Sequence, residues 1–251
     1  MQVIDKEKVK KGFLKALKTY DDHASVQHLM GLELVRELRS FSPKQFGTVL
    51  EIGSGTGRFT KYLNRDTRFL QFYCNELFKE AFPYVVKWCK KENFIVGDGE
   101  DVAKLPDNIE LLASNATFQW FNNLSQFLMS VHSKLTKDAI VAFSTFGKNQ
   151  FKETREITGR SLEYIERKEL EEKIKEKYET LFFSEWEQVL KFASIKRVLR
   201  HILATGVSGV PSSPPPPIDF ATFQTKYKEM FYDEEMYPLT YHPQIWILKA
   251  L

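Results

Sequence analysis

The chain has 251 residues, of which 43% are hydrophobic, and its 36 basic and 33 acidic side chains leave a formal net charge of +3. This length and apolar content suffice for one large α/β domain with added elements, and the near balance of charge argues against a protein that coats nucleic acid. No apolar run approaches the ~20 residues of a membrane span, and no signal-like apolar segment starts the sequence, so we expect a soluble cytoplasmic protein. Cys74 and Cys89 lack C-x-x-C spacing, which favours buried reduced thiols over a disulfide or a metal site.

The N-terminal region is expected to form two helices. Residues 5–19 carry an apolar stripe surrounded by lysines, and residues 25–40 carry a second stripe that begins at a potential cap, Ser25. Tyr20, His23 and Gln27 lie around the junction of the two helices. They are either ordinary surface residues or part of a segment that folds over the mouth of a ligand site.

A glycine-rich turn follows the first expected strand. Val49–Ile52 is a short apolar run, Gly53, Gly55 and Gly57 follow at alternate positions, and apolar residues then recur at helical spacing. Glycine permits a positive φ and lets a ligand approach the backbone without meeting a Cβ. Strand, turn and helix in this order predict the first unit of a nucleotide-binding α/β fold, with a generic tight turn as the alternative.

The spacing of these glycines indicates the kind of ligand. It differs from the G-x-G-x-x-G of a dinucleotide site and from the lysine-containing phosphate loop. Glu51 precedes the first glycine by two residues, and the resulting E-x-G-x-G-x-G pattern resembles motif I of class I methyltransferases that use S-adenosylmethionine. An acidic residue beside the turn suits the cationic amino group and sulfonium of that cofactor.

Acidic residues also follow the second and third expected strands. Glu76 follows the strand Phe69–Cys74, about twenty positions past the turn, where a carboxylate can bind two ribose hydroxyls. Asp98 follows the strand Phe94–Val96, where the exocyclic amine of adenine would find an acceptor. The alternatives are a surface carboxylate for Glu76 and a turn aspartate for Asp98.

The fourth expected strand, Ile109–Ser114, leads into polar and aromatic residues. Ligands of a doubly wound sheet bind beyond the carboxyl ends of its strands, so Asn115, Gln119, Trp120 and Phe121 are candidates for the wall around the reacting atoms. The alternative is that Phe118, Trp120 and Phe121 belong to the hydrophobic core. The residues that we expect to bind the cofactor are Glu51, Gly53, Ser54, Gly55, Gly57, Glu76, Leu77, Asp98, Gly99, Glu100, Asn115 and Ala116.

The predicted fold is α/β and Rossmann-like, with a seven-stranded, mostly parallel sheet and helices on both faces. Ser194 is expected to cap a helix, and the proline run Pro214–Pro217 is expected to form a surface loop. The remaining expected elements are helices 78–90, 124–135, 195–204 and 219–231 and strands 139–145, 186–192 and 239–248. The expected organisation is a single domain over 1–251, with an N-terminal helical cover (1–40), a cofactor-binding core (41–147), cap elements (148–180 and 194–235) and last strands (186–192 and 237–250).

Several stretches together resemble one family. They are Phe13–Gln27, Val49–Gly53, Gly97–Glu100, Leu105–Pro106, Ser114–Trp120, Ala142–Gly147, Leu199–His201, Thr205–Gly206 and Leu239–His242. In order along the whole chain, they are similar to the malonyl-acyl carrier protein O-methyltransferases. The S-N-A-x-x-Q-W and Y-x-x-H-A-x-x-Q runs are more specific than the glycine turn. Ser54 replaces a cysteine that is frequent in the family, and the proline run has no counterpart that we recognise.

The resemblance implies methyl transfer from S-adenosylmethionine to the free carboxylate of malonyl-acyl carrier protein, an early step of pimeloyl and biotin synthesis. A carboxylate is already ionised at neutral pH, so we expect no general base and no acid–base catalytic residue. Arginine suits a carboxylate clamp, and Arg155 is the first candidate, ahead of Lys148 and Arg160. The residues expected at the substrate are Tyr20, His23, Gln27, Gln119, Trp120, Lys148 and Arg155.

The implied partner is an acidic acyl carrier protein, with no nucleic acid or membrane, and a monomer is compatible with the sequence. Its docking surface is expected on one of two basic helices. These carry Lys6, Lys10, Lys11 and Lys15, or Lys196, Arg197 and Arg200. The alternatives are a methyltransferase for a free small carboxylic acid or a phenolic acceptor, and a non-catalytic binding subunit that retains the fold.

Overall fold

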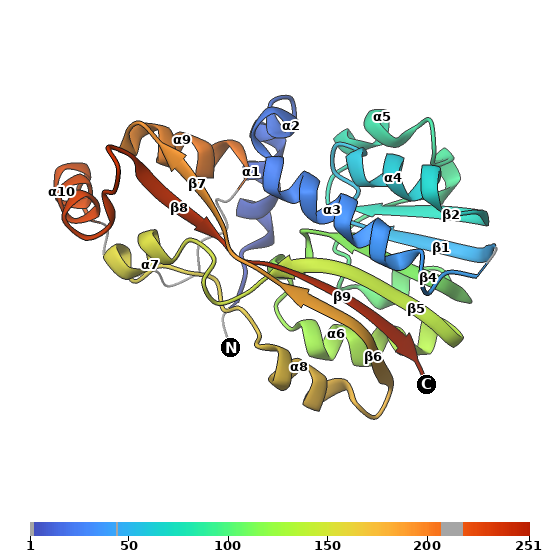
Figure 1. Cartoon of the computed structure of the whole chain (residues 1–251). Coiled ribbons are helices and arrows are strands. Elements are labelled where there is room, and N and C mark those ends of the chain that lie inside the picture. The colour runs from blue at the N-terminus through green and yellow to red at the C-terminus, as the bar shows by residue number, and fades with distance from the viewer. Residues whose placement is uncertain (1–2, 44, 207–217) are drawn as a thin grey trace.

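The chain is organised around a seven-stranded sheet in the computed structural model, which describes residues 3–43, 45–206 and 218–251 (Figure 1). The strand order is β3-β2-β1-β4-β5-β9-β6. Strands β1 to β5 pair in parallel, and β9 runs antiparallel to both β5 and β6, which confirms the predicted sheet. The strands are β1 (Phe46–Ile52), β2 (Phe69–Glu76), β3 (Phe94–Val96), β4 (Ile109–Asn115), β5 (Leu135–Phe146), β6 (Tyr178–Glu185) and β9 (Pro243–Ala250).

Helices cover both faces of this sheet, as predicted (Figure 1). On one face, α3 (Ser25–Leu38), α4 (Arg58–Asp66) and the single turn α5 (Phe82–Val85) pack against alternate residues of the central strands. On the other face lie α6 (Leu124–Val131) and α8 (Arg167–Ile174). The central strands are therefore covered on both sides, which explains why their sequences are nearly continuous apolar runs.

A second layer of elements forms a cap beyond one end of the sheet. Strands β6 and β9 continue outward into a two-stranded sheet of β7 (Gln188–Phe192) and β8 (Tyr237–Tyr241) (Figure 1). Around it lie α7 (Lys152–Thr158), α9 (Ile195–Ala204) and α10 (Phe220–Phe231). Ser194 caps α9, as predicted, by accepting a hydrogen bond from Arg197 N–H.

The N-terminal segment closes over the carboxyl ends of the parallel strands. It contains α1 (Lys6–Ala16) and the single turn α2 (Tyr20–His23), and both contact α9. Ile4 and Val9 are buried together with Trp120, whose loop follows β4. Among the described helices, none has the length and apolar character that crossing a membrane requires.

Three of the predicted elements are placed wrongly. The predicted strand 239–248 is divided between β8 and β9, which belong to different sheets. The sixth strand of the large sheet is β6, whereas the predicted strand Trp186–Phe192 overlaps β7 and pairs with β8. β6 lies at the edge of the sheet and is only half-buried, and the charged run before it resembles an exposed helix, so its own pattern is weak. The predicted helix 78–90 is a 3-10 turn followed by α5; Pro83, near the start of α5, lacks the N–H that a longer helix needs.

The predicted cap of α3 is also wrong. Ala24 is the N-cap residue, Ser25 is already helical, and no side chain accepts a hydrogen bond there. The preceding turn α2 ends with Ala24 N–H bonded to the carbonyl of Tyr20, so the backbone itself sets the entry into α3. The proline run Pro214–Pro217 lies outside the described residues.

Candidate active site

A cleft lies beyond the carboxyl ends of β1 to β4, between the glycine turn and the N-terminal segment. Most of the residues predicted to bind a cofactor line it. They are Gly53, Ser54, Gly55, Glu76, Leu77, Asp98, Gly99, Asn115 and Ala116. Residues from four separate strands meet here because parallel pairing aligns the strand ends at one edge of the sheet.

The glycine turn has the backbone that its composition predicts. Gly53, Gly55 and Gly57 have φ values of 78°, 48° and 73°, in the left-handed region that L residues rarely adopt. A Cβ on Gly53 would meet the side chain of Thr117, and one on Gly57 would lie 2.6 Å from the carbonyl oxygen of Tyr84. A Cβ on Gly55 would meet nothing within 4 Å, so this glycine presents bare backbone to the cleft.

Glu76 joins the glycine turn to the end of β2. One carboxylate oxygen accepts a 2.8 Å hydrogen bond from Gly55 N–H, and the other accepts a 2.7 Å bond from Leu77 N–H. Its side chain is buried at the wall of the cleft, and burial raises the pKa of Glu76 to about 7. Each oxygen retains a second lone pair for a hydroxyl donor in the cleft.

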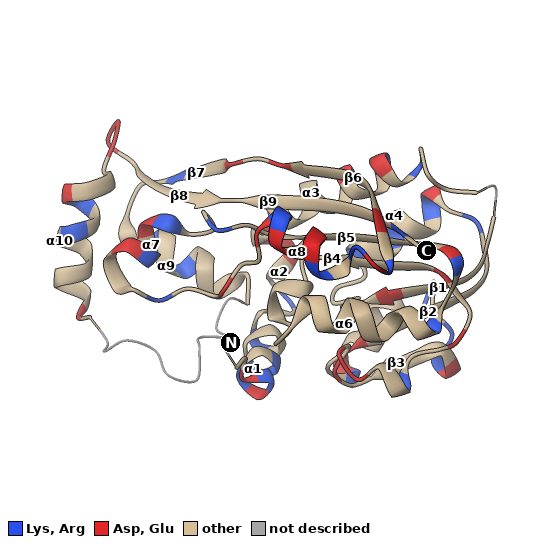
Figure 2. Ribbon diagram, turned by 90° about the horizontal axis from the view of Figure 1, so that it is seen from below, with Lys and Arg blue, Asp and Glu red and all other residues tan. Residues whose placement is uncertain are grey.

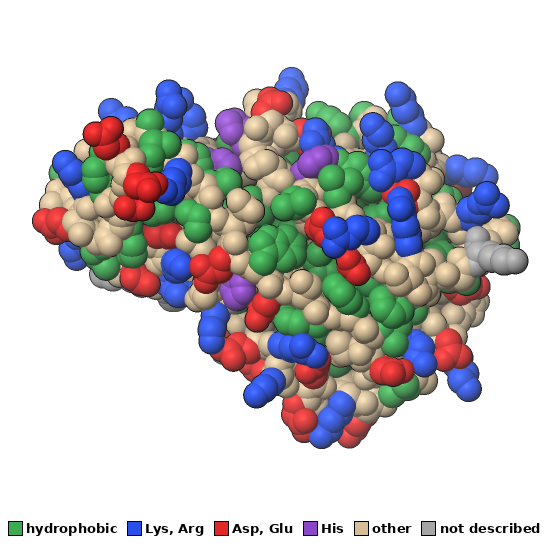
Figure 3. Space-filling view, viewed as in Figure 1, with side chains coloured by type: hydrophobic (Ala, Val, Ile, Leu, Met, Phe, Trp, Pro, Cys, Tyr) green, Lys and Arg blue, Asp and Glu red, His purple; other side chains and the backbone are tan. Residues whose placement is uncertain are grey.

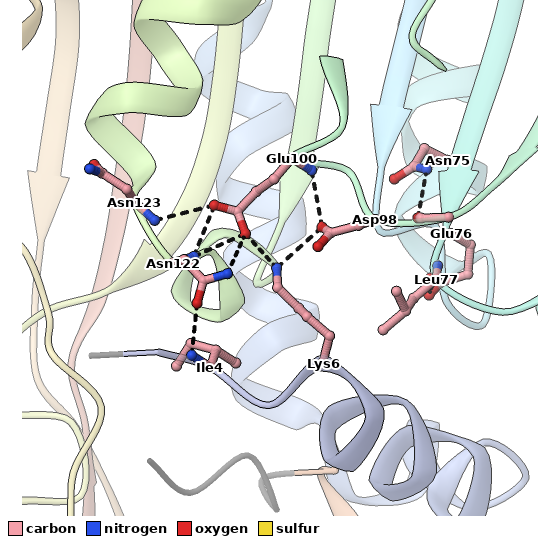
Figure 4. Close-up of polar contacts among 10 residues, drawn as sticks. Ile4, Lys6, Asn75, Glu76, Leu77, Asp98, Glu100, Asn122 and Asn123 are labelled. Carbon is pink, nitrogen blue, oxygen red and sulfur yellow. Dashed lines mark hydrogen bonds and ion pairs between the residues drawn. The ribbon is translucent and has the colours of Figure 1, made fainter. Parts of the chain in front are cut away.

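Asp98 is held by a residue that sequence reasoning assigned elsewhere. Lys6 on α1 places its Nζ 3.2 Å from Asp98 and 2.6 Å from Glu100 (Figure 4). The same Nζ lies 4.9 Å from the centre of the Phe121 ring. Glu100 also accepts hydrogen bonds from the backbone N–H groups of Asn122 and Asn123. Lys6 therefore lines the cleft and ties α1 to the loop after β3.

The other predicted cofactor residues, Glu51, Gly57 and Glu100, do not line the cleft. Glu51 is fully buried beneath the turn, and burial raises its pKa to about 8. Gly57 allows the turn to enter α4, and Glu100 fastens the neighbouring loop. These residues support the walls of the cleft rather than face its interior.

A smaller chamber adjoins the cleft and shares part of its wall. Tyr20, Gln27 and Trp120 line both spaces, and Gln119 lines the chamber. The chamber also contacts Gln150, and its other walls come from α1, the loop after β5 and the cap. Two of the three polar residues singled out in the predicted cover, Tyr20 and Gln27, thus lie where the cleft and the chamber meet.

The three remaining residues that were predicted to contact substrate lie outside the chamber. The ring of His23 is 6.2 Å from that of His201, centre to centre. Lys148 pairs with Glu166 at 2.9 Å between Nζ and the carboxylate, and Arg155 donates a hydrogen bond to the carbonyl of Lys148. Neither predicted carboxylate clamp therefore lines the chamber, although Arg155 lies close enough to Tyr164 of the chamber wall for its charge to oppose the rise in the Tyr164 pKa that burial causes.

Sequence reasoning missed a polar group at another part of the cleft. Arg58, the first residue of α4, lies 3.3 Å from the carboxylate of Asp21, which also accepts a 2.8 Å hydrogen bond from Thr56. His28 lies 2.5 Å from the Tyr62 hydroxyl. The position of Arg58 directly after the last glycine was the available signal, since residues at a helix N-terminus face ligands in this type of turn.

The strand order with its antiparallel β9, together with a glycine turn that opens into a cleft at the strand ends, defines a class I methyltransferase. A family model described as a methyltransferase domain matches residues 50–143. A solved structure of a candidate methyltransferase from Bacillus halodurans has a TM-score of 0.62 and 9% identity, covering 86% of this chain and 97% of its own. The YcgJ protein of Bacillus subtilis has a TM-score of 0.58 and 10% identity, covering 87% and 97%.

Relatives of known name narrow this class to one family. The malonyl-acyl carrier protein O-methyltransferase of Bacteroides thetaiotaomicron is 32% identical over 254 residues, covering 94% of this chain and 95% of the relative. The protein of the same name from Calditerrivibrio nitroreducens is 30% identical over 239 residues, covering 95% of each. The chain therefore belongs to the malonyl-acyl carrier protein O-methyltransferase family.

The glycine turn allows a matched test of its geometry. Gly53→Ala should lower the free energy of unfolding by about 2 kcal/mol or more, because the strained φ and the contact with Thr117 act together. Gly55→Ala should cost only about 1 kcal/mol, since its Cβ enters open space. Urea unfolding of both variants measures the difference, and equal losses would contradict the described turn.

Proposed function

We propose that this protein transfers a methyl group from S-adenosylmethionine to the free carboxylate of malonyl-acyl carrier protein, giving the methyl ester. The observation that carries the proposal is the shared wall of Tyr20, Gln27 and Trp120, which sets an acceptor chamber directly against a cofactor cleft. The names of the relatives supply the acceptor. By the same resemblance, the ester serves an early step of pimeloyl and biotin synthesis.

The residues of the cleft fit this cofactor. Glu76 offers carboxylate lone pairs to the ribose hydroxyls, and Asp98 offers an acceptor to the adenine amine. The bare backbone at Gly55 allows close approach, and Arg58 provides a cation for the carboxylate of the amino-acid portion. When bound, S-adenosylmethionine supplies a methyl group activated by its sulfonium.

The proposed reaction needs no proton transfer. An acceptor carboxyl with an ordinary pKa of about 4 is ionised at neutral pH. Its oxygen forms a bond to the methyl carbon while the carbon–sulfur bond breaks, and the electron pair of that bond goes to sulfur. The chain contributes positioning and the exclusion of water by α1 and the cap.

The acyl carrier protein is proposed to dock on α1 and α9, which contact each other above the chamber. Both helices carry basic side chains (Figure 2), and on the face seen in Figure 3 basic side chains stand around α9, with acidic ones among them. Phe13 of α1, and Thr205 at the end of α9, line the chamber below. Lys6 does not belong to this surface, because it points inward to Asp98 and Glu100.

The acceptor can be tested directly. Purified protein should methylate malonyl-acyl carrier protein with a higher kcat/KM than malonyl-coenzyme A, and free malonate should be the poorest of the three. Release of S-adenosylhomocysteine and the mass of the ester measure the reaction. Preference for free malonate or a phenol would support the corresponding small-molecule enzyme, and failure to bind S-adenosylmethionine in calorimetry would support the non-catalytic alternative.

The docking surface predicts a salt-dependent effect on KM. Four charge reversals on α1 and α9 should raise the KM for the carrier-bound substrate at low salt and leave kcat nearly unchanged, because the reversed side chains are exposed. They are Lys11→Glu, Lys15→Glu, Arg197→Glu and Arg200→Glu. The matched control reverses the same number of exposed lysines around α4 and α5, at Lys61, Lys87, Lys90 and Lys91. An equal KM in the two variants would contradict docking on α1 and α9.

Glu76 predicts a pH dependence of cofactor binding. Its pKa of about 7 means that the free protein holds a proton there at lower pH, whereas ribose hydroxyls favour the ionised carboxylate. Affinity for S-adenosylmethionine should therefore rise from about pH 6 to about pH 8 and then level off. Calorimetry should show that Glu76→Gln weakens binding and removes this rise, whereas exposed Glu80→Gln retains it. A rise that persists in Glu76→Gln would assign the pH dependence to another group.

A further inference from the structure

We propose that the chamber holds the acceptor carboxylate with uncharged hydrogen-bond donors, led by the indole N–H of Trp120 with the Tyr20 hydroxyl beside it. The opposite charge would come from the sulfonium across the shared wall instead of from a protein cation. This inference rests on the proposed function. It replaces the arginine clamp that the sequence led us to expect, and it makes the carboxylate site complete only when the cofactor is bound.

The first observation is the chemical character of the chamber. Among the described residues that line it, none is Lys, Arg, His, Asp or Glu, although several are polar. Neither Lys148 nor Arg155 lines the chamber, since Lys148 pairs with Glu166 and Arg155 donates to the carbonyl of Lys148. His201 lies nearby but is bonded to the Tyr241 hydroxyl at 2.8 Å, and burial lowers its pKa to about 4, so it carries no charge at neutral pH.

The second observation is a buried donor without a partner. Trp120 is 5% exposed, and its Nε1 has no hydrogen-bond partner among the described residues. An indole nitrogen can only donate, and an unpaired buried donor is destabilising, so this N–H is suited to a ligand acceptor. Its side chain lines both the cleft and the chamber, which is where a carboxylate would meet a methyl group.

Two neighbouring side chains complete the set of donors. Burial raises the pKa of Tyr20, so its hydroxyl keeps the proton that it can donate. Gln27 is 6% exposed, and its Oε1 is unpaired. The Gln27 amide lies within hydrogen-bonding reach of the Tyr241 hydroxyl. Rotation of the amide by 180° would direct its N–H groups into the chamber and let Oε1 accept a hydrogen bond from Tyr241.

Gln119 indicates how the methyl-accepting substrate is oriented in the chamber. Its Nε2 donates a 2.6 Å hydrogen bond to the carbonyl of Ala116, which fixes the amide and leaves Oε1 buried and unpaired. An acceptor oxygen repels a carboxylate but suits an N–H group. The carboxylate end therefore belongs at Trp120, and the end beside Gln119 suits an amide of the arm that carries the thioester.

Charge neutralisation explains why an uncharged site is favourable. The reactants carry opposite charges at the reacting atoms, and both charges disappear as the ester forms. A fixed cation would stabilise the charged carboxylate more than the transition state and would therefore slow transfer. Neutral donors stabilise the carboxylate less strongly, so they slow transfer less. Without any counter-charge, however, a buried carboxylate is costly, so its binding should depend on the sulfonium.

The test compares two cofactor analogues in the wild-type protein. Sinefungin carries an ammonium group in place of the methylated sulfonium, whereas S-adenosylhomocysteine carries a neutral thioether. Calorimetry should show malonyl-acyl carrier protein binding at least about tenfold more tightly with sinefungin, from the attraction between nearby opposite charges. The methyl ester of the same carrier should bind equally with both, because it has no charge to neutralise.

Substitutions then separate the neutral donor from the former cation candidates. Trp120→Phe should reduce malonyl-carrier affinity in the sinefungin complex roughly 10- to 100-fold, as expected for a hydrogen bond to a charged group. Its melting temperature and sinefungin affinity report whether the fold and the cleft are intact. Trp186→Phe, outside both spaces, and the double variant Lys148→Gln, Arg155→Gln should bind within about twofold of wild type.

Each outcome bears on one claim. Equal malonyl-carrier affinity with both analogues would overturn the inference, and so would a loss in the double variant as large as that in Trp120→Phe. Either result would leave the proposed function standing. Absence of malonyl-carrier binding with both analogues, together with absence of methyl transfer, would instead contradict the proposed function. If Trp120→Phe fails to fold, the comparison of analogues in the wild-type protein still decides.

Discussion

The hydrogen bond from Gly55 N–H to the Glu76 carboxylate is the interaction on which the site depends. It joins the turn after β1 to the end of β2. The exposed backbone of Gly55 is thereby held beside the carboxylate of Glu76. The left-handed backbone of the turn makes this approach possible, because a Cβ at Gly53 or Gly57 would collide with its surroundings. Burial of the carboxylate then leaves it poised for hydroxyl donors in the cleft.

The N-terminal segment and the cap convert this open edge of a sheet into two adjoining spaces. Lys6 bridges Asp98 and Glu100 from α1, and Trp120 packs with Val9 of the same helix. The cap adds Tyr164 and Thr205 to the chamber wall, and both lie near Tyr241. Charged groups thus lie in the cleft, where a cationic cofactor would bind, and uncharged groups line the chamber. Charged and uncharged residues are separated in this way because the long charged side chains near the chamber bind partners that do not line it.

Local patterns were sufficient for much of the fold and of the cleft. The parallel strands, the helices between them and the cleft residues Glu76 and Asp98 were predicted because parallel pairing aligns successive strand ends at one edge. The edge strand β6 was missed because a half-buried strand beside a charged helix has little periodicity of its own. Lys148 and Arg155 were assigned to the substrate from residue type and position, but Lys148 pairs with Glu166, and Arg155 donates a hydrogen bond to the carbonyl of Lys148.

The sequence by itself determined the class of fold, the glycine turn and the carboxylates after β2 and β3, because these depend on interactions within a strand, a turn and the helix that follows. The resemblance to a known family indicated which molecule accepts the methyl group. Only the tertiary structure decided that Lys6 faces Asp98, that Glu51 is fully buried, and that the described residues lining the chamber beside Trp120 include no Lys, Arg or His. These features are set by contacts between elements distant in the chain, and a side chain's charge alone cannot specify which partner it will meet.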